Sequence, residues 1–127
     1  MLKIKTIVNP SSISGLGLFC KEFVPKNTLV WQNHTDSELI LSKEIFQNMS
    51  AYMQETFQHY GYLDKNTLEW KLPLDDSRFM NHSDNPNLWQ DEQGNSIAKN
   101  DILPGEEVTC NYRDFVNANE VAGFSNW

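Results

Sequence analysis

The chain has 127 residues, 39% of them hydrophobic and 21% charged, and a formal net charge of −7 at pH 7. Its length suits one domain with a core of its own, and its composition is globular, which excludes a disordered chain; no apolar run is long enough for a membrane-spanning helix. The acidic balance disfavours binding to nucleic-acid phosphates and favours a cationic partner such as a lysine-rich protein, although acidity that only keeps the protein in solution is the simpler explanation of the charge alone.

Short strands separated by turns are predicted for the first quarter of the chain. Residues 2–8 alternate between apolar and polar side chains, and Asn9-Pro10-Ser11-Ser12 breaks the pattern. Two glycines lead into a second, apolar strand over residues 15–20. A turn at Pro25-Lys26-Asn27 then precedes a third strand over residues 28–32.

One helix is predicted near the middle of the chain. Ser42 can serve as its N-cap, and Gly61 can end it. Between them, apolar and aromatic side chains recur at helical spacing: Ile45, Phe46, Met49, Tyr52, Met53, Phe57 and Tyr60. The simplest interpretation of this stripe is the buried face of the helix and not a ligand site.

The second half of the chain again has the pattern of strands. Residues 68–74 alternate cleanly between apolar and polar side chains, which predicts a strand. Pro73 has no N–H to donate, so it is expected at the edge of a sheet or at the end of the strand. Residues 88–90 and 96–99 are predicted to form a hairpin, and the turn at Pro104-Gly105 precedes a strand over residues 106–112. The tail from residue 113 is weakly helical at first. These elements predict a mostly-β fold with one inserted helix, in a single domain over residues 1–127.

The two cysteines, Cys20 and Cys110, are far apart and form no CxxC pair, which disfavours a disulfide framework and a cysteine-rich zinc site. The lysines near Met1 are not followed by the apolar core of a secretion signal. The sequence therefore predicts two buried thiols in a reducing compartment, and the cytoplasm is the expected location.

Gly15-Leu16-Gly17 is the first of three stretches that can carry chemistry. Two glycines one residue apart let the backbone bend sharply and let a ligand approach closely, because no Cβ is in the way. The stretch lacks the later glycine of a dinucleotide-binding fingerprint and precedes a strand, so a Rossmann site is disfavoured. Taken alone, it is best explained as a simple loop.

The second stretch, residues 78–87, reads RFMNHSDNPN. Phe79 and Met80 are apolar, and the Asn, Asp and Ser side chains after them cap their own backbone and leave amides and carbonyls pointing outward. Such a loop suits a ligand with both donors and acceptors, for example an adenine and an amino-acid end; a well-capped turn is the alternative. His82 has no second histidine or carboxylate at metal-binding spacing, so no metal site is predicted.

The third stretch, residues 105–112, reads GEEVTCNY and brings Tyr112 to the end of a strand. A tyrosine hydroxyl can donate or accept a hydrogen bond and can therefore orient an amine. A core tyrosine at a strand end is the alternative explanation.

Together and in this order, the three stretches resemble the SET-domain family of protein-lysine methyltransferases. Residues 14–19 are similar to the family's glycine motif, residues 78–87 match its RFxNHSxxPN motif almost letter for letter, and residues 105–112 match its GEExTxxY motif. The resemblance covers nearly the whole chain, with the motif-bearing core over residues 3–115. Its second motif is highly specific, its third is moderately so, and its first is weak alone.

The resemblance implies a β-clip fold of small curled sheets with a C-terminal pseudoknot, in which Phe79 and Met80 anchor the Asn-His segment in the core. It also implies that S-adenosyl-L-methionine is the cofactor, and that its methyl group is transferred to the ε-amine of a lysine in a protein substrate. Tyr112 matches the family's catalytic tyrosine.

A set of site residues follows from the same resemblance. The residues implied to bind the cofactor are Gly15, Leu16, Gly17, Arg78, Asn81, His82, Tyr112 and Phe115, the glycine loop through its backbone. Phe124 and Trp127 are further candidates, beside Phe115, for the aromatic residue that covers the adenine. Tyr60 and Tyr62 are candidates for lining the channel of the substrate lysine.

Two departures from the family pattern bear on function. Asn111 stands where many members have an aspartate, which removes a charge beside Tyr112. In addition, no cysteine-rich zinc segment follows Tyr112. The site is then closed by the tail over residues 116–127, by a partner chain as in a homodimer, or by the substrate.

The expected partner is a basic, lysine-containing protein, with neither nucleic acid nor a membrane involved. The nucleus would replace the cytoplasm as the location of a eukaryotic or viral enzyme. A catalytically inactive SET-like module that serves as a protein-interaction domain is the alternative function. Asn81, His82 and Tyr112 are all retained, which favours the enzyme.

Overall fold

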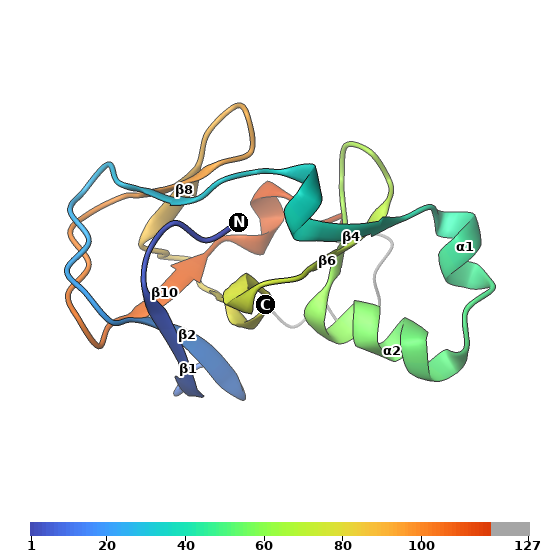
Figure 1. Ribbon diagram of the computed structural model, residues 1–127, viewed down its shortest axis with the longest axis horizontal. Coiled ribbons are helices and arrows are strands. Elements are labelled where there is room, and N and C mark those ends of the chain that lie inside the picture. The colour runs from blue at the N-terminus through green and yellow to red at the C-terminus, as the bar shows by residue number, and fades with distance from the viewer. Residues whose placement is uncertain (118–127) are drawn as a thin grey trace.

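A computed structural model of the chain describes residues 1–117, and these residues form mostly short strands in three small sheets (Figure 1). The mostly-β class predicted from the sequence is confirmed. The first sheet has the strand order β1-β2-β10-β7, and its strands are Thr6–Pro10 (β1), Leu16–Cys20 (β2), Glu107–Cys110 (β10) and Asn81–His82 (β7).

The first sheet brings the three sequence motifs together. β2, which follows the glycines, pairs antiparallel with β1 and with β10. β7, which contains the Asn-His pair, runs parallel to β10, with Asn81 opposite Thr109 and His82 opposite Cys110. This pairing places the Asn-His segment directly beside the strand that leads to Tyr112.

The first strand is displaced from its predicted position over residues 2–8. β1 begins at Thr6 and continues through Pro10, which an outer strand tolerates. Leu2 instead forms a bridge with Trp31 of the second sheet. The alternating pattern therefore covers two pairings, because the chain passes from one sheet to another within it.

The second sheet contains the predicted hairpin. β8 (Leu88–Gln90) and β9 (Ser96–Ala98) pair antiparallel, and β3 (Leu29–Trp31) extends the sheet in the order β3-β9-β8.

The third sheet has the order β4-β6-β5 and consists of Glu38–Leu41 (β4), Trp70–Pro73 (β6) and Tyr62–Leu63 (β5). Pro73 ends β6, as predicted, and lies opposite Glu38. Neither β4 nor β5 was predicted, because strands of four and two residues are too short to show a period.

Two helices, α1 (Lys43–Gln47) and α2 (Ala51–Tyr60), replace the single helix predicted from the sequence. The predicted ends are right, since Ser42 caps the start of α1 and Gly61 follows the end of α2. The break between them arises at Ser50, whose hydroxyl accepts a backbone N–H and starts the second helix.

The interpretation of the apolar stripe as one buried face was wrong. Phe46 and Phe57 are buried, but Ile45 is 55% exposed and Tyr52 is 76% exposed. Because the second helix starts anew at Ser50, positions that are spaced as in one helix point in different directions.

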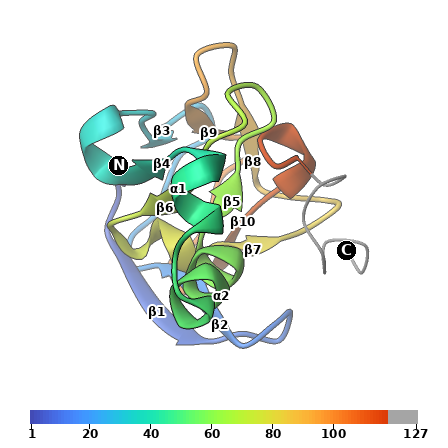
Figure 2. The same ribbon diagram turned by 90° about the vertical axis from the view of Figure 1, so that its right-hand side faces the viewer.

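Two hydrophobic clusters form the core, and their elements lie at the left and right of Figure 1. The members of the first cluster are Leu18, Cys20, Val24, Val30, Met80, Leu88, Ala98, Ile102, Val108 and Cys110. Those of the second, which joins the helices to the third sheet, are Phe46, Phe57, Leu63, Trp70 and Leu72. Figure 2 faces the helical end of the molecule, where α2 packs against β5 and β6.

A short 3-10 helix over Asp76–Phe79 (η2) joins the two parts, because it contacts β1 and β2 of the first sheet and β6 of the third. It leads directly into β7. The Asn-His segment is therefore held at the junction of the two clusters.

Candidate functional site

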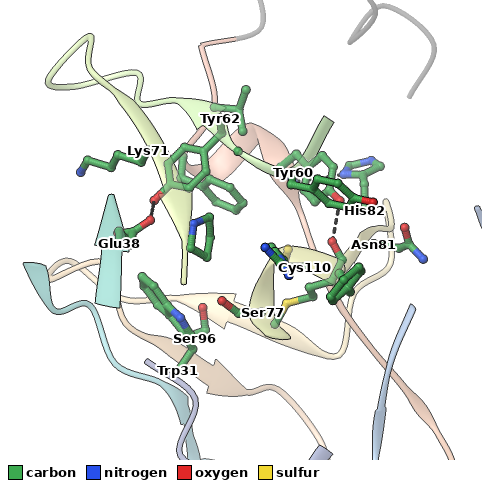
Figure 3. A pocket seen from close by; sticks show the side chains of 18 of the residues that line it. Trp31, Glu38, Tyr60, Tyr62, Lys71, Ser77, Asn81, His82, Ser96 and Cys110 are labelled. Atoms are coloured by element: carbon green, nitrogen blue, oxygen red, sulfur yellow. Dashed lines mark hydrogen bonds between the residues drawn. The ribbon is translucent and has the colours of Figure 1, made fainter. Parts of the chain in front are cut away.

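Residues from all three sheets line one cavity of about 880 Å³ (Figure 3). This volume lies in the range of small-molecule sites. Figure 3 shows Tyr60, Asn81 and His82 on one side of the cavity and Glu38, Tyr62 and Trp31 on the other.

Asn81 joins the glycine loop to the Asn-His segment. Its side-chain Nδ2 donates to the carbonyl oxygens of Ser14 and Leu16, each at 3.1 Å. Gly15 lies between these two carbonyls with φ +45°, a conformation that favours glycine, and its Cα faces open space. The amide of Asn81 therefore fixes the shape of the loop on the cavity side.

Gly17 has a packing role, and it does not line the cavity. A Cβ built on Gly17 would lie 1.9 Å from Oε1 of Glu107 and 3.0 Å from Cβ of Ser11. The absence of a side chain lets β2 and β10 approach each other here. Gly17, the second glycine of the motif, therefore contributes to the packing of the first sheet.

Both ring nitrogens of His82 are engaged. Nδ1 accepts the backbone N–H of Tyr112 at 3.1 Å, so the neutral ring carries its proton on Nε2. Nε2 lies 3.0 Å from Oδ1 of Asp84, which also accepts a bond of 2.6 Å from Arg113. The hydrogen bonds from Arg113 and His82 lower the pKa of Asp84, which stays ionised at neutral pH.

Tyr112 lies at the end of β10, with its hydroxyl donating to the carbonyl oxygen of Met80 at 2.5 Å. Its ring is 5.3 Å from that of His82 and 5.9 Å from that of Phe115, between centroids. Burial raises the pKa of Tyr112. The phenol is therefore protonated at neutral pH and does not act there as a base.

The guanidinium of Arg78 lies over two rings that also line the cavity. Its Cζ is 5.5 Å from the ring centre of Tyr60 and 5.1 Å from that of Phe79. Phe79 is half-buried, while Met80 is in the core, so only Met80 fully meets the anchoring role that the resemblance implied. A cation held against ring faces is well placed to meet a carboxylate of a ligand.

Tyr62 and Glu38 form a buried pair on the other side. The Tyr62 hydroxyl donates to Oε2 of Glu38 at 2.6 Å, and the Tyr62 ring makes an edge contact with Phe115 at 4.9 Å. Glu38 is 6% exposed. Burial raises the pKa of Glu38, against the opposing effects of the Tyr62 hydrogen bond and the charge of Lys71. Burial also raises the pKa of Tyr62, which remains a donor.

Sequence reasoning missed Glu38 and the wall that the second sheet contributes to the cavity. That wall consists of Trp31, Asn33, Gln90, Gly94 and Ser96. No motif marks these residues. The alternation over residues 88–99 predicts the hairpin but not which face of it meets a ligand, and Glu38 reaches the cavity only through the pairing of β4 with β6.

The cavity brings together most of the site residues predicted from the sequence. Those that line it are Gly15, Leu16, Tyr60, Tyr62, Arg78, Asn81, His82, Tyr112 and Phe115. Gly17 lies beside it. Phe124, Trp127 and most of the predicted closing tail lie outside the described residues.

Cys20 and Cys110 are both free and buried, which confirms the prediction of buried thiols. Over residues 1–117, no group of three or more His, Cys, Asp or Glu side chains is placed to hold a metal ion. In the same part of the chain, no helix has the length and apolar character needed to cross a membrane.

Comparison with known proteins agrees with the family that the motifs indicate and with the fold. The family model of the SET domain matches residues 15–113. A solved structure of a Plasmodium falciparum protein assigned as a histone methyltransferase superposes with a TM-score of 0.58 at 24% identity, covering 87% of this chain and 95% of that one. A search of curated proteins gives no match. Because the family model spans all three motifs and most of the chain, this protein belongs to the SET-domain family of protein-lysine methyltransferases.

Proposed function

We propose that this protein transfers a methyl group from S-adenosylmethionine to the ε-amine of a lysine in a protein substrate. The observation that carries the proposal is the meeting of three groups at one cavity: the glycine loop, the Asn-His segment and the protonated Tyr112 hydroxyl. Each comes from a different motif, and each is held by a hydrogen bond to another.

The residues present fit the cofactor. The loop at Gly15 and Leu16 offers backbone groups without obstruction, and the guanidinium of Arg78 suits the carboxylate of an amino-acid end. The rings of Phe79 and Phe115 line the same cavity and suit an adenine. When bound, S-adenosylmethionine supplies an electrophilic methyl group on a positively charged sulfur.

The lysine has to be neutral before it can attack a methyl group. Its ordinary pKa is about 10.4, so removing its proton at pH 7 costs about 4 to 5 kcal/mol. Burial in the cavity and a nearby positive charge both lower that pKa, and the proton can leave through water. No residue of the chain has to act as a strong base.

Tyr112 orients the amine in this proposal. Because its one proton goes to the Met80 carbonyl, any bond between the hydroxyl and an amine N–H has the tyrosine oxygen as the acceptor. Such a bond aims the nitrogen lone pair, and correct aim contributes substantially to the rate of a displacement. The bond between His82 and the Tyr112 backbone supports this position.

The substrate proposed is a basic protein, since the chain is acidic with a net charge of −7. The test has two steps. Calorimetry with S-adenosylmethionine measures cofactor binding. Radiolabelled methyl transfer to core histones and to lysine-rich peptides, followed by mass spectrometry, then identifies the modified side chain.

Tyr112→Phe is the decisive variant, because it keeps the ring and removes the hydroxyl. We expect its cofactor affinity to be within about twofold of the parent and its methyl transfer to fall by about 100-fold or more. Absence of cofactor binding at millimolar concentration overturns the proposal. Cofactor binding without transfer to any of these substrates supports the inactive binding module instead.

A further inference from the structure

The charged residues that line the cavity are distributed unevenly. They are Glu38, Asp64, Lys71 and Arg78. Asp64 and Lys71 neutralise each other across 3.1 Å. Arg78 lies over the ring of Tyr60. Figure 3 shows Tyr60 on the side of the Asn-His segment, and Glu38 on the opposite side with its partner Tyr62. One side of the cavity therefore presents a cation, and the other presents a carboxylate.

Glu38 forms no ion pair with another residue of 1–117, and the charges of Lys71 and the terminal amine of Met1 act on it only from beyond 4.0 Å. No Lys, Arg or His nitrogen there lies within 4.0 Å of its carboxylate, and its hydrogen-bond donor in that part of the chain is the Tyr62 hydroxyl, on Oε2. A buried carboxylate ordinarily has a cationic partner or several donors, because burial removes the water that stabilises its charge. This carboxylate lines a cavity, so a ligand can supply what the chain does not.

A second group on the same side also needs a ligand. The indole N–H of Trp31 is buried and finds no acceptor within the described part of the chain. Trp31 lines the cavity below Glu38 in Figure 3. The Glu38 carboxylate, which can accept from a cation, and the Trp31 indole N–H, which can donate to a carbonyl, thus lie on one wall. A lysine residue within a peptide carries both an ammonium group and a carbonyl, so it could bind both.

A row of rings leads from this wall to the tyrosine at the end of β10. Tyr62 contacts Phe115 at 4.9 Å and Phe115 contacts Tyr112 at 5.9 Å, between centroids. Aromatic faces accommodate both an alkyl chain and an ammonium group. The row therefore offers a path for a lysine side chain between Glu38 and Tyr112.

We propose that Glu38 binds the ammonium form of the substrate lysine when it enters the cavity, with Tyr62 holding the carboxylate in place. This inference rests on the proposed methyltransferase function and names the residue that selects a positively charged side chain. Loss of one N–H proton from the ammonium group to water then yields the neutral amine, which passes along the rings to Tyr112. Glu38 is thus a substrate-recognition residue, distinct from those that face the cofactor.

The test uses n-butylamine, which is an ammonium ion at pH 7.5 and has the length of a lysine side chain. It is titrated into the protein, alone and with S-adenosylhomocysteine, and followed by NMR of ¹⁵N-labelled backbone amides. Glu38→Gln is the test variant because its amide oxygen still accepts the Tyr62 hydroxyl. Asp36→Asn is the matched control, because it removes the same charge only two residues away in the sequence. The side chain of Asp36 is 84% exposed.

We expect Glu38→Gln to weaken butylammonium binding by about tenfold or more, while Asp36→Asn changes it by less than about twofold. Neutral 1-pentanol should bind the parent and Glu38→Gln equally. Equal butylammonium affinity in the parent and Glu38→Gln, or no butylammonium binding by the parent, overturns the inference. S-adenosylhomocysteine binding is read separately in the same experiment, so a failure of the proposed cofactor function is distinguished from a failure of the role of Glu38.

Discussion

The backbone N–H of Tyr112 donates to Nδ1 of His82 at 3.1 Å, and this bond ties the Asn-His segment to the end of β10. The Tyr112 hydroxyl returns to the same segment through the Met80 carbonyl. Two bonds, one from the backbone and one from the side chain, thus hold the phenol at the cavity. The orientation of Tyr112 depends on residues far from it in the sequence.

His82→Phe should lower the free energy of unfolding by about 1 to 3 kcal/mol, because the partly buried N–H of Tyr112 loses its acceptor. His82→Asn should lower the free energy of unfolding by less, since the side-chain oxygen of asparagine can occupy nearly the place of Nδ1. Urea unfolding monitored by circular dichroism measures both. A loss in His82→Asn that exceeds the loss in His82→Phe would show that the bulk of the ring, and not its Nδ1 acceptor, makes the larger contribution.

Gly61→Ala should destabilise the chain more than Gly17→Ala. A Cβ at Gly61 would lie 2.5 Å from the Lys71 carbonyl and 2.8 Å from the Phe57 carbonyl, and neither backbone group can move without disrupting the third sheet or α2. We expect a loss of about 3 kcal/mol, at the upper end of overpacking effects. A Cβ at Gly17 meets first the flexible end of Glu107, so about 1 kcal/mol is expected there. Thermal unfolding of the two variants checks the order, which a larger loss for Gly17→Ala would contradict.

The stability of the chain should depend on pH through Glu38. Burial raises the pKa of this carboxyl in the folded state, so the folded chain holds the proton at pH values where the unfolded chain has released it. The contribution of Glu38 to stability is therefore present at low pH and falls as pH rises from the ordinary glutamate range through the raised pKa. Lys71, Asp64 and the terminal amine of Met1 also act on this carboxyl, so a comparison of variants is needed.

Glu38→Gln provides that comparison. Its free energy of unfolding relative to the parent should increase with pH across this window, measured by urea unfolding at intervals from pH 4 to pH 8. Asp36→Asn serves as the exposed control. A relative stability of Glu38→Gln that is flat, or that decreases with pH, would show that the folded state does not disfavour the ionised carboxylate.

Both thiols should resist alkylation until the chain unfolds. Burial raises the pKa of Cys20 to about 11 and that of Cys110 to about 12, and the thiolate is the reactive form. At pH 8 we expect reaction with iodoacetamide to be at least about 100-fold slower than for a free cysteine, whose pKa is about 8.5. Mass spectrometry of timed samples, with and without urea, measures the rates. Rapid labelling of Cys110 in the folded protein would show that the thiol is reached through the cavity.

The parts of the site that could be predicted are those that local motifs encode. Asn81, His82 and Tyr112 lie in short stretches whose residue types are recognisable without knowledge of their neighbours. The hairpin of β8 and β9 and the caps at Ser42 and Gly61 were predictable for the same reason.

The parts that could not be predicted depend on contacts between distant residues. Glu38 becomes a cavity residue because β4 pairs with β6. β4 has four residues, which is too short for an alternating pattern to predict the strand. Ser50 resembles any polar residue on the outer face of a helix, so the second cap, and with it the division of the apolar stripe, was missed. Gly17 was predicted to bind the cofactor, and its packing against Glu107 could not be foreseen because Glu107 is 90 residues away in the sequence.

β10 lies between β2 and β7 in its sheet, although it is the last of the three to leave the ribosome. During synthesis, the edge of β2 and the Asn-His segment therefore stay unpaired until residues 107–110 have left the ribosome, and the cavity is incomplete on a shorter nascent chain. Ligand cannot assist the early stages of folding on the ribosome. Until residues 107–110 emerge, these unpaired strand edges are open to pairing with other chains, which favours aggregation.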